Sequence, residues 1–308
     1  MIDLTTTLCG ITFPNPLVLA SGILGTEAAL MERVARSGAG GVTSKSCGPG
    51  PRSGHPNPTV LDWGPGLINA VGLANPGVKA EVQILRETKA RLRPLGVPLI
   101  ASIFAETVEG FGDVARRVSA AGPDLIEVNI SCPNVAAEFG RPFALDPGSA
   151  AAVTRRVREA TAIPITVKLS PNTPDLVAIG QAAVEAGADA LTAINTVGPG
   201  IVIDLDSRMP ILANRVGGVS GPAIRPIAVR CVYDLARAVD VPIVGTGGVC
   251  NGRDALEMIL AGATLVGVGS AVYGRGPQVF GAIRDEMEAW MQTHGINTLH
   301  EIRGKAHA

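Results

Sequence analysis

The chain has 308 residues, a length that fits one large domain or two small ones. Its formal net charge of −1 gives no indication of a nucleic-acid partner or an anionic membrane surface. No apolar run approaches the ~20 residues that span a bilayer. The N-terminus lacks the basic and apolar segments of a signal peptide, so a cytoplasmic location is expected.

Eight short apolar runs recur along the chain and predict β-strands at residues 17–22, 41–46, 98–104, 125–131, 164–170, 190–196, 242–248 and 265–271. Amphipathic, alanine-rich stretches between them predict helices, among them 27–37, 107–121, 148–160, 174–186 and 225–239. Strands that alternate with helices indicate a parallel sheet. Eight such units within roughly 250 residues favour an α/β fold of the closed (β/α)8 TIM barrel type over an open sheet. We expect one domain over residues 1–308.

Three connections are too long for simple loops between a strand and the next helix. They cover residues 47–76, 132–147 and 198–221, and each follows the C-terminal end of a predicted strand. Active sites of TIM barrels lie at that face. These long insertions are therefore predicted to be functional lids or interfaces rather than surface decoration.

The fourth predicted strand runs into a polar cluster that ends in Cys132, with Pro133 directly behind it. Proline stops a strand ladder, so the thiol is expected at the strand's end, flanked by Asn129 and Asn134. A thiol there can act as base or nucleophile, and two amides can bind a planar, imide-like ring. The alternative is a buried structural cysteine, but an apolar core would not select the flanking asparagines.

Two lysines, Lys45 and Lys168, fall inside otherwise apolar predicted strands. A buried ammonium is costly unless it meets an anion or loses its proton. Lys168 is therefore predicted to face an anionic ligand.

The last two predicted strands end in Gly247-Gly248 and Gly269-Ser270. Glycines let backbone N–H groups approach a ligand closely, and this region of a barrel commonly binds phosphate. Paired glycine motifs on adjacent strands predict a phosphorylated cofactor, although Gly-Gly alone is often only a turn.

Histidine is missing from the predicted strand ends, and so is a buried carboxylate pair. The four histidines fall in a loop and in the C-terminal tail. Cys132 is then the best candidate for a general base. Cys47 is the second candidate and is expected to be a packing residue. The five cysteines are scattered, with no Cys-x-x-Cys pair, so no disulfide framework, metal site or iron–sulfur cluster is expected in this chain.

Several motifs occur together in the order found in one enzyme family, at residues 13–16, 69–73, 129–134, 167–172, 195–196 and 217–224. With these motifs the chain resembles the class 1 dihydroorotate dehydrogenases, flavin enzymes of pyrimidine biosynthesis. The resemblance implies one FMN per chain, bound over the barrel mouth. It also implies oxidation of dihydroorotate to orotate, with Cys132 taking the C5 proton while a hydride passes from C6 to the flavin.

The resemblance also implies site residues. The FMN phosphate would contact Gly247, Gly248, Gly269 and Ser270, with Gly221 nearby. The rest of the cofactor would be lined by Ser21, Lys45, Ser46, Asn129, Lys168 and Ile194. Dihydroorotate would be bound by Lys45, Asn69, Ala70, Val71, Gly72, Leu73, Asn129, Asn134, Asn195 and Thr196. Ser102 stands where the family usually places an asparagine that reaches the flavin, and a hydroxyl keeps only part of that contact.

Family branches that use serine as the base and carry an N-terminal extension for membrane quinones differ from this chain. Residues 211–214 and 217–224 resemble the B subclass. Its partner flavoprotein carries FAD and a [2Fe–2S] cluster and passes electrons to NAD. The chain has no Gly-x-Gly-x-x-Gly dinucleotide motif of its own. We expect a heterotetramer of two such chains, as a homodimer core, and two partner subunits.

Other readings remain open at this point. The dihydropyrimidine dehydrogenase barrel, which acts on uracil and thymine, shares the Ser-Cys-Pro element but has histidine in place of Asn134. A fumarate-linked homodimeric dihydroorotate dehydrogenase is a second alternative. A phosphate-binding lyase or isomerase, or an inactive flavin-binding module, would be a function without redox chemistry.

Overall fold

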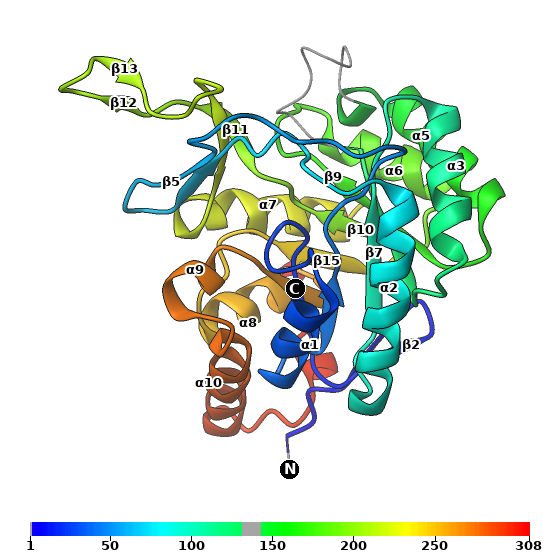
Figure 1. Ribbon diagram of the computed structural model, residues 1–308. Helices are drawn as coiled ribbons and strands as arrows, with labels where there is room; N and C mark the ends of the chain where they lie inside the picture. The colour runs from blue at the N-terminus through cyan, green and yellow to red at the C-terminus, as the bar shows by residue number, and fades with distance from the viewer. Residues whose placement is uncertain (1, 131–142) are drawn as a thin grey trace.

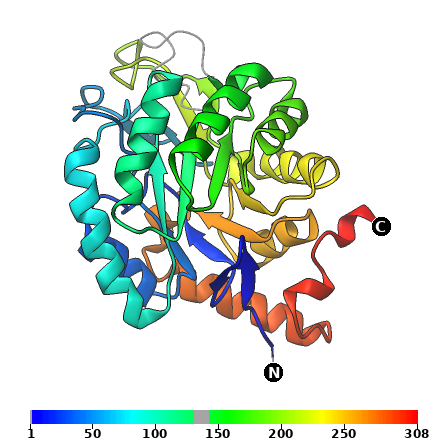
Figure 2. The same cartoon turned by 90° about the vertical axis from the view of Figure 1, so that its right-hand side faces the viewer.

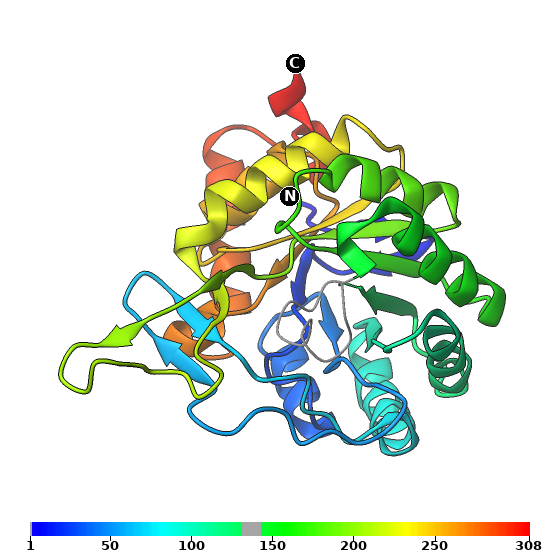
Figure 3. The same ribbon diagram turned by 90° about the horizontal axis from the view of Figure 1, so that it is seen from above.

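A computed structural model describes residues 2–130 and 143–308. Eight parallel strands close into a barrel, and their order around it follows their order in the chain (Figure 3). They are β3 (Leu17–Leu19), β4 (Gly41–Thr43), β7 (Leu99–Ile103), β8 (Leu125–Asn129), β9 (Ile165–Leu169), β10 (Ala190–Ala193), β15 (Ile243–Thr246) and β16 (Leu265–Val268). The predicted TIM barrel is confirmed, and each of its strands lies within a predicted run.

Helices surround the barrel (Figure 3). They are α1 (Ala28–Arg36), α2 (Val78–Leu92), α3 (Val108–Ser119), α5 (Pro147–Ala160), α6 (Leu176–Glu185), α7 (Arg225–Ala236), α8 (Gly252–Leu260), α9 (Ala271–Arg275) and α10 (Val279–Thr293). Short 3-10 turns are η1 (Arg93–Leu95), η3 (Phe143–Leu145), η4 (Pro222–Ile224), η5 (Leu299–Glu301) and η6 (Lys305–His307).

Local sequence explains where several of the helices begin. The side chains of Thr107, Asp146 and Asn251 each accept a backbone N–H at the beginning of α3, α5 and α8.

The N-terminal end of the barrel is closed by an antiparallel hairpin of β1 (Thr6–Leu8) and β2 (Ile11–Phe13), at the lower end in Figure 2. Leu8 and Phe13 of this hairpin pack into an apolar cluster with one residue from most of the barrel strands: Val18, Ile100, Leu125, Ala190, Val244 and Leu265. The N-terminal end of the barrel is therefore filled by apolar side chains, and the polar cavity lies at the opposite end.

Two of the long insertions combine at the mouth. A four-stranded sheet is made of β5 (Val60–Asp62) and β6 (Leu67–Asn69) from the first, and of β11 (Val197–Gly200) and β14 (Gly217–Ser220) from the third. A further hairpin of β12 (Ile203–Asp204) and β13 (Met209–Pro210) projects from the barrel (Figure 1). Most of the second insertion, with Cys132 and Asn134, lies outside the described residues.

The second barrel strand is shorter than its apolar run suggests. It ends at Thr43, so Lys45 and Ser46 lie in the connection beyond it and not inside the strand. The backbone N–H of Lys45 donates to the Gly25 carbonyl at 2.8 Å and not to a barrel strand. The placement of Lys45 within a strand was therefore wrong, whereas Lys168 does lie within β9.

Within residues 2–130 and 143–308, no helix is long and apolar enough to cross a membrane. The same part of the chain contains no group of three or more His, Cys, Asp or Glu side chains placed to hold a metal ion.

Candidate functional site

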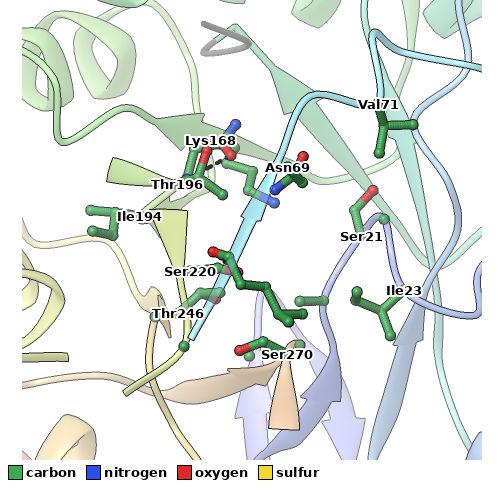
Figure 4. A pocket seen from close by; sticks show the side chains of 18 of the residues that line it. Ser21, Ile23, Asn69, Val71, Lys168, Ile194, Thr196, Ser220, Thr246 and Ser270 are labelled. Carbon is green, nitrogen blue, oxygen red and sulfur yellow. Dashed lines mark hydrogen bonds between the residues drawn. The ribbon is translucent and has the colours of Figure 1, made fainter. Parts of the chain in front are cut away.

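A cavity opens at the C-terminal ends of the barrel strands, beneath the four-stranded sheet. Figure 4 shows Lys168, Thr196 and Asn69 on one side of it and Thr246 and Ser270 on the other. The strand ends and the insertion sheet thus enclose one cavity. Amide and lysine side chains line one of its ends, and glycines and hydroxyl side chains line the other.

Every predicted cofactor-binding residue except Ser102 lines this cavity: Ser21, Lys45, Ser46, Asn129, Lys168, Ile194, Gly221, Gly247, Gly248, Gly269 and Ser270. The predicted substrate-binding residues that line it, besides Lys45 and Asn129, are Asn69, Val71, Gly72, Leu73, Asn195 and Thr196. Ala70 is fully buried and does not reach the cavity. Asn134 and Cys132 are not among the described residues.

Sequence reasoning missed further lining residues: Ala20, Gly22, Ile23, Val60, Leu67, Ser220, Ile224, Thr246, Val249 and Gly267. Ala20, Gly22 and Thr246 adjoin predicted residues, so the strand-end pattern could have included them. Val60 and Leu67 belong to the insertion sheet, and no local signal places that sheet over the barrel.

One end of the cavity is built from glycines in backbone conformations that other residues rarely adopt. The φ angles of Gly221, Gly247 and Gly248 are +96°, +136° and +76°. A Cβ on Gly248 would meet the Cβ of Arg225 at 2.6 Å, and one on Gly247 would meet the Cβ of Ala228 at 2.6 Å. Because α7 packs closely behind Gly247 and Gly248, larger residues are excluded at these two positions and the backbone stays open toward the cavity.

The other end carries amide side chains that are oriented by hydrogen bonds. Asn129 Nδ2 donates to Ser46 Oγ at 3.3 Å, and Asn195 Nδ2 donates to Asn129 Oδ1 at 3.4 Å. Asn69 Nδ2 donates to the Gly218 carbonyl of β14 at 3.3 Å. These amides present both donors and acceptors, the complement of a planar ring with N–H and C=O groups.

Charge at the cavity is positive. Among the described residues that line it, the charged side chains are those of Lys45 and Lys168. Lys168 Nζ lies 3.5 Å from Glu127 Oε1, and both side chains are buried. Lys168 therefore meets an anion that belongs to the protein itself. Sequence reasoning predicted an anionic ligand there and missed Glu127.

Ser102 lies one layer below the cavity and is 1% exposed. Its hydroxyl is 2.8 Å from Ser46 Oγ and donates to Glu127 Oε1 at 3.0 Å. Ser102 thus does not line the cavity itself but contacts two side chains, of which Ser46 lines it, and its contact with a cofactor stays a prediction.

Cys47 is confirmed as a packing residue. It is fully buried in the hydrophobic core. Burial raises the pKa of the Cys47 thiol well above its usual range, and the nearby Glu81 carboxylate adds to that rise. Such a thiol does not ionise readily, so it is a poor general base.

A parallel eight-stranded barrel with a polar, cationic cavity at its C-terminal mouth has the architecture of a barrel enzyme. The sequence model of the dihydroorotate dehydrogenase family matches residues 3–291, and the chain belongs to this family.

Relatives of this chain include three proteins that are each named dihydroorotate dehydrogenase B (NAD(+)), catalytic subunit. The chain is 45% identical over 304 residues to that of Methanothermobacter thermautotrophicus, covering 99% of this chain and 98% of the relative. It is 45% identical over 302 residues to that of Methanosarcina mazei, covering 98% and 94%. It is 43% identical over 299 residues to that of Pyrococcus furiosus, covering 97% of both.

Proposed function

We propose that this chain is the catalytic subunit of an NAD-linked dihydroorotate dehydrogenase of the B type, which oxidises dihydroorotate to orotate in pyrimidine biosynthesis. The observation that carries the proposal is the cavity, in which a glycine-lined end faces an amide-lined end and Lys45 and Lys168 both line the wall. Membership of the family and the names of the relatives support it.

FMN fits the residues present. Gly221, Gly247, Gly248 and Gly269 form a cradle of backbone that suits a phosphate group, and at Gly221, Gly247 and Gly248 there is no room for a larger side chain. Lys45 and Lys168 supply positive charge for an anionic ligand. Ser21, Ser46 and Ile194 would contact the remaining cofactor surface.

The amide end would bind dihydroorotate. Asn69, Asn129, Asn195 and Thr196 can pair with the ring's N–H and C=O groups, and Lys45 with its carboxylate. Asn134 belongs to the same proposed set. The insertion sheet covers this end and would limit the access of water to the bound ring.

Cys132 is the proposed general base. Its thiolate would take the C5 proton, and the electrons of that C–H bond would form the C5–C6 double bond of orotate as the C6 hydride leaves. When bound, FMN supplies the hydride acceptor. Asn129, on the strand that leads into the cysteine, would hold the ring so that C5 faces the sulfur.

The relatives' names describe a catalytic subunit, and such a name implies another subunit. We propose that a partner flavoprotein with FAD and a [2Fe–2S] cluster carries the electrons on to NAD. Two of these chains would form a homodimer core that binds two partner subunits in the cytoplasm.

The test is anaerobic mixing of the FMN-loaded chain with dihydroorotate. We expect the yellow flavin absorbance to bleach and orotate to form, one per flavin. Dihydrouracil serves as the control and should leave the absorbance unchanged. Failure to take up FMN, or bleaching by dihydrouracil in place of dihydroorotate, would contradict the proposal.

A further inference from the structure

Polar residues alternate with apolar ones along β8 and β9, the two strands that lead to the amide end of the cavity. In β8 the cross-strand register sets Glu127 beside Ser102 of β7, and it sets Asn129 beside Lys168 of β9. Successive side chains of a strand point to opposite faces, so Glu127 and Asn129 share the face toward the barrel interior. One polar layer therefore lies directly below the cavity wall.

Glu127 occupies this layer as a buried carboxylate, with a side chain that is 6% exposed. Burying a carboxylate is costly unless a cation and hydrogen-bond donors offset the loss of water. Glu127 Oε1 accepts from Ser102 Oγ at 3.0 Å and lies 3.5 Å from Lys168 Nζ. The same oxygen thus contacts a hydroxyl and an ammonium, and the ammonium belongs to a residue of the cavity wall.

Hydroxyl groups extend this contact to the cavity. Ser102 Oγ lies 2.8 Å from Ser46 Oγ, which lies 3.2 Å from Ser21 Oγ and accepts from Asn129 Nδ2 at 3.3 Å. Ser21, Ser46 and Asn129 all line the cavity. A continuous chain of polar contacts therefore joins the Glu127 carboxylate to four lining residues, Lys168 included.

We propose that Glu127 is a positioning residue, which holds the Lys168 ammonium at the cavity wall, offsets part of its charge, and orients Ser46 and Asn129 through Ser102. The inference rests on the proposed function, because the affected ligands are FMN and dihydroorotate. Ser102 is essential to it, since its short hydroxyl contacts both Glu127 and Ser46.

The main test is the reduction potential of FMN bound to Glu127→Gln. This substitution removes the negative charge and keeps the shape, so the Lys168 charge is no longer offset. We expect the equilibrium to move toward reduced FMN by about tenfold, which is ~30 mV upward for a two-electron couple. Lys168→Met should move the potential in the opposite direction. A structural lesion common to both variants would not produce shifts of opposite sign.

Two further variants separate the charge from the hydroxyl chain. Ser102→Ala keeps the ion pair and interrupts the path to Ser46, so we expect an unchanged potential and several-fold weaker orotate binding. Thr154→Val is the matched control, because the buried Thr154 hydroxyl donates to the Ala150 carbonyl at 2.7 Å within α5 and does not belong to β7, β8 or β9. Thr154→Val should change neither quantity.

Unfolding of the cofactor-free protein provides a measurement that does not depend on FMN. Each single variant, Glu127→Gln or Lys168→Met, leaves one buried group without its charged partner and should lower the unfolding temperature. The double variant should recover most of that loss. Additive losses would overturn the proposed pairing.

The outcomes distinguish the two proposals. Absence of FMN uptake by the wild-type chain contradicts the proposed function. Normal FMN uptake with the same potential in Glu127→Gln and wild type contradicts the role of Glu127 and leaves the proposed function standing.

Discussion

Cys132 is the residue on which the proposed proton transfer depends, since no histidine and no other thiol is among the described residues that line the cavity. We expect Cys132→Ala to retain FMN and to slow flavin reduction by dihydroorotate about 10²–10⁴-fold, the usual loss for a general base. Cys132→Ser should keep some activity that improves at high pH. Stopped-flow absorbance measures both rates.

Cys47→Ala is the control for this experiment, because Cys47 is a buried thiol with a raised pKa. It should lower stability and leave the reduction rate unchanged. A near-wild-type rate in Cys132→Ala together with a slow Cys47→Ala would reverse the assignment of the base.

Glu81 of α2 is a second residue whose ionisation matters. It is fully buried, and neither carboxylate oxygen has a hydrogen-bond partner in the described part of the chain. Burial raises the pKa of Glu81 from 4.5 to about 7, although the positive charge of Lys45 opposes part of the rise. The folded protein therefore binds a proton at this site that the unfolded chain releases near pH 4.5.

This shift predicts a pH-dependent stability. The unfolded state binds fewer protons than the folded state between pH 4.5 and 7, so the contribution of Glu81 is fully present below pH 4.5 and is lost as pH rises through 7. Glu81→Gln removes this dependence. We therefore expect the free energy of unfolding of Glu81→Gln, measured relative to that of wild type, to rise by about 3 kcal/mol as the pH is raised from 4.5 to 8.

Urea unfolding across this pH range measures the effect, with Glu185→Gln on the exposed end of α6 as the control. The control should follow the wild-type profile. Parallel profiles for wild type and Glu81→Gln would show that Glu81 does not titrate with a raised pKa.

At the scale of elements, the pairing of β14 with β6 sets the position of Asn69 over the mouth. Gly217 and Gly218 allow this close approach, because a Cβ on Gly217 would lie 2.5 Å from the Asn69 carbonyl oxygen. A Cβ on Gly218 would lie 2.1 Å from Thr196 Oγ1. The glycines of β14 thus belong to the architecture of the amide end.

Gly217→Ala should therefore displace Asn69 and weaken orotate binding by about tenfold, the equivalent of one hydrogen bond to the ligand. FMN affinity should fall much less, because Gly247, Gly248 and Gly269 of the cradle lie at the ends of β15 and β16 and not on β14. Titration calorimetry with each ligand separates the two effects. Gly274→Ala in α9, where a Cβ meets nothing within 4 Å, is the control. Equal losses for both ligands would contradict this division of the cavity.

At the scale of the whole molecule, the proposed partner decides where the electrons go. The cavity would hold one flavin, and its amide end would be occupied by dihydroorotate. We expect the isolated FMN-loaded chain to turn over with dichloroindophenol and to form little NADH. Addition of a partner flavoprotein from a B-type relative should restore NADH formation.

Steady-state assays with the three acceptors distinguish the subclasses. Rapid NADH formation by the isolated chain would contradict the need for a partner. Brisk turnover with fumarate would assign the chain to the homodimeric, fumarate-linked subclass.

The sequence by itself determined the barrel and most of the cavity's lining. Parallel strands that follow one another around a barrel bring their C-terminal ends to one mouth, whatever the details of packing. Residues such as Lys168, Asn129 and Gly247 could therefore be assigned to a common site from their positions at strand ends alone.

Tertiary structure decided what lies beside and above those residues. The pairing of Glu127 with Lys168 depends on the register between β8 and β9, which a strand pattern does not specify. Likewise, Val60 and Leu67 reach the cavity because two insertions, far apart in the chain, pair as one sheet. Local sequence sets which face of a strand a side chain occupies. Long-range strand pairing sets which side chain it meets, and that neighbour offsets its charge and holds its orientation.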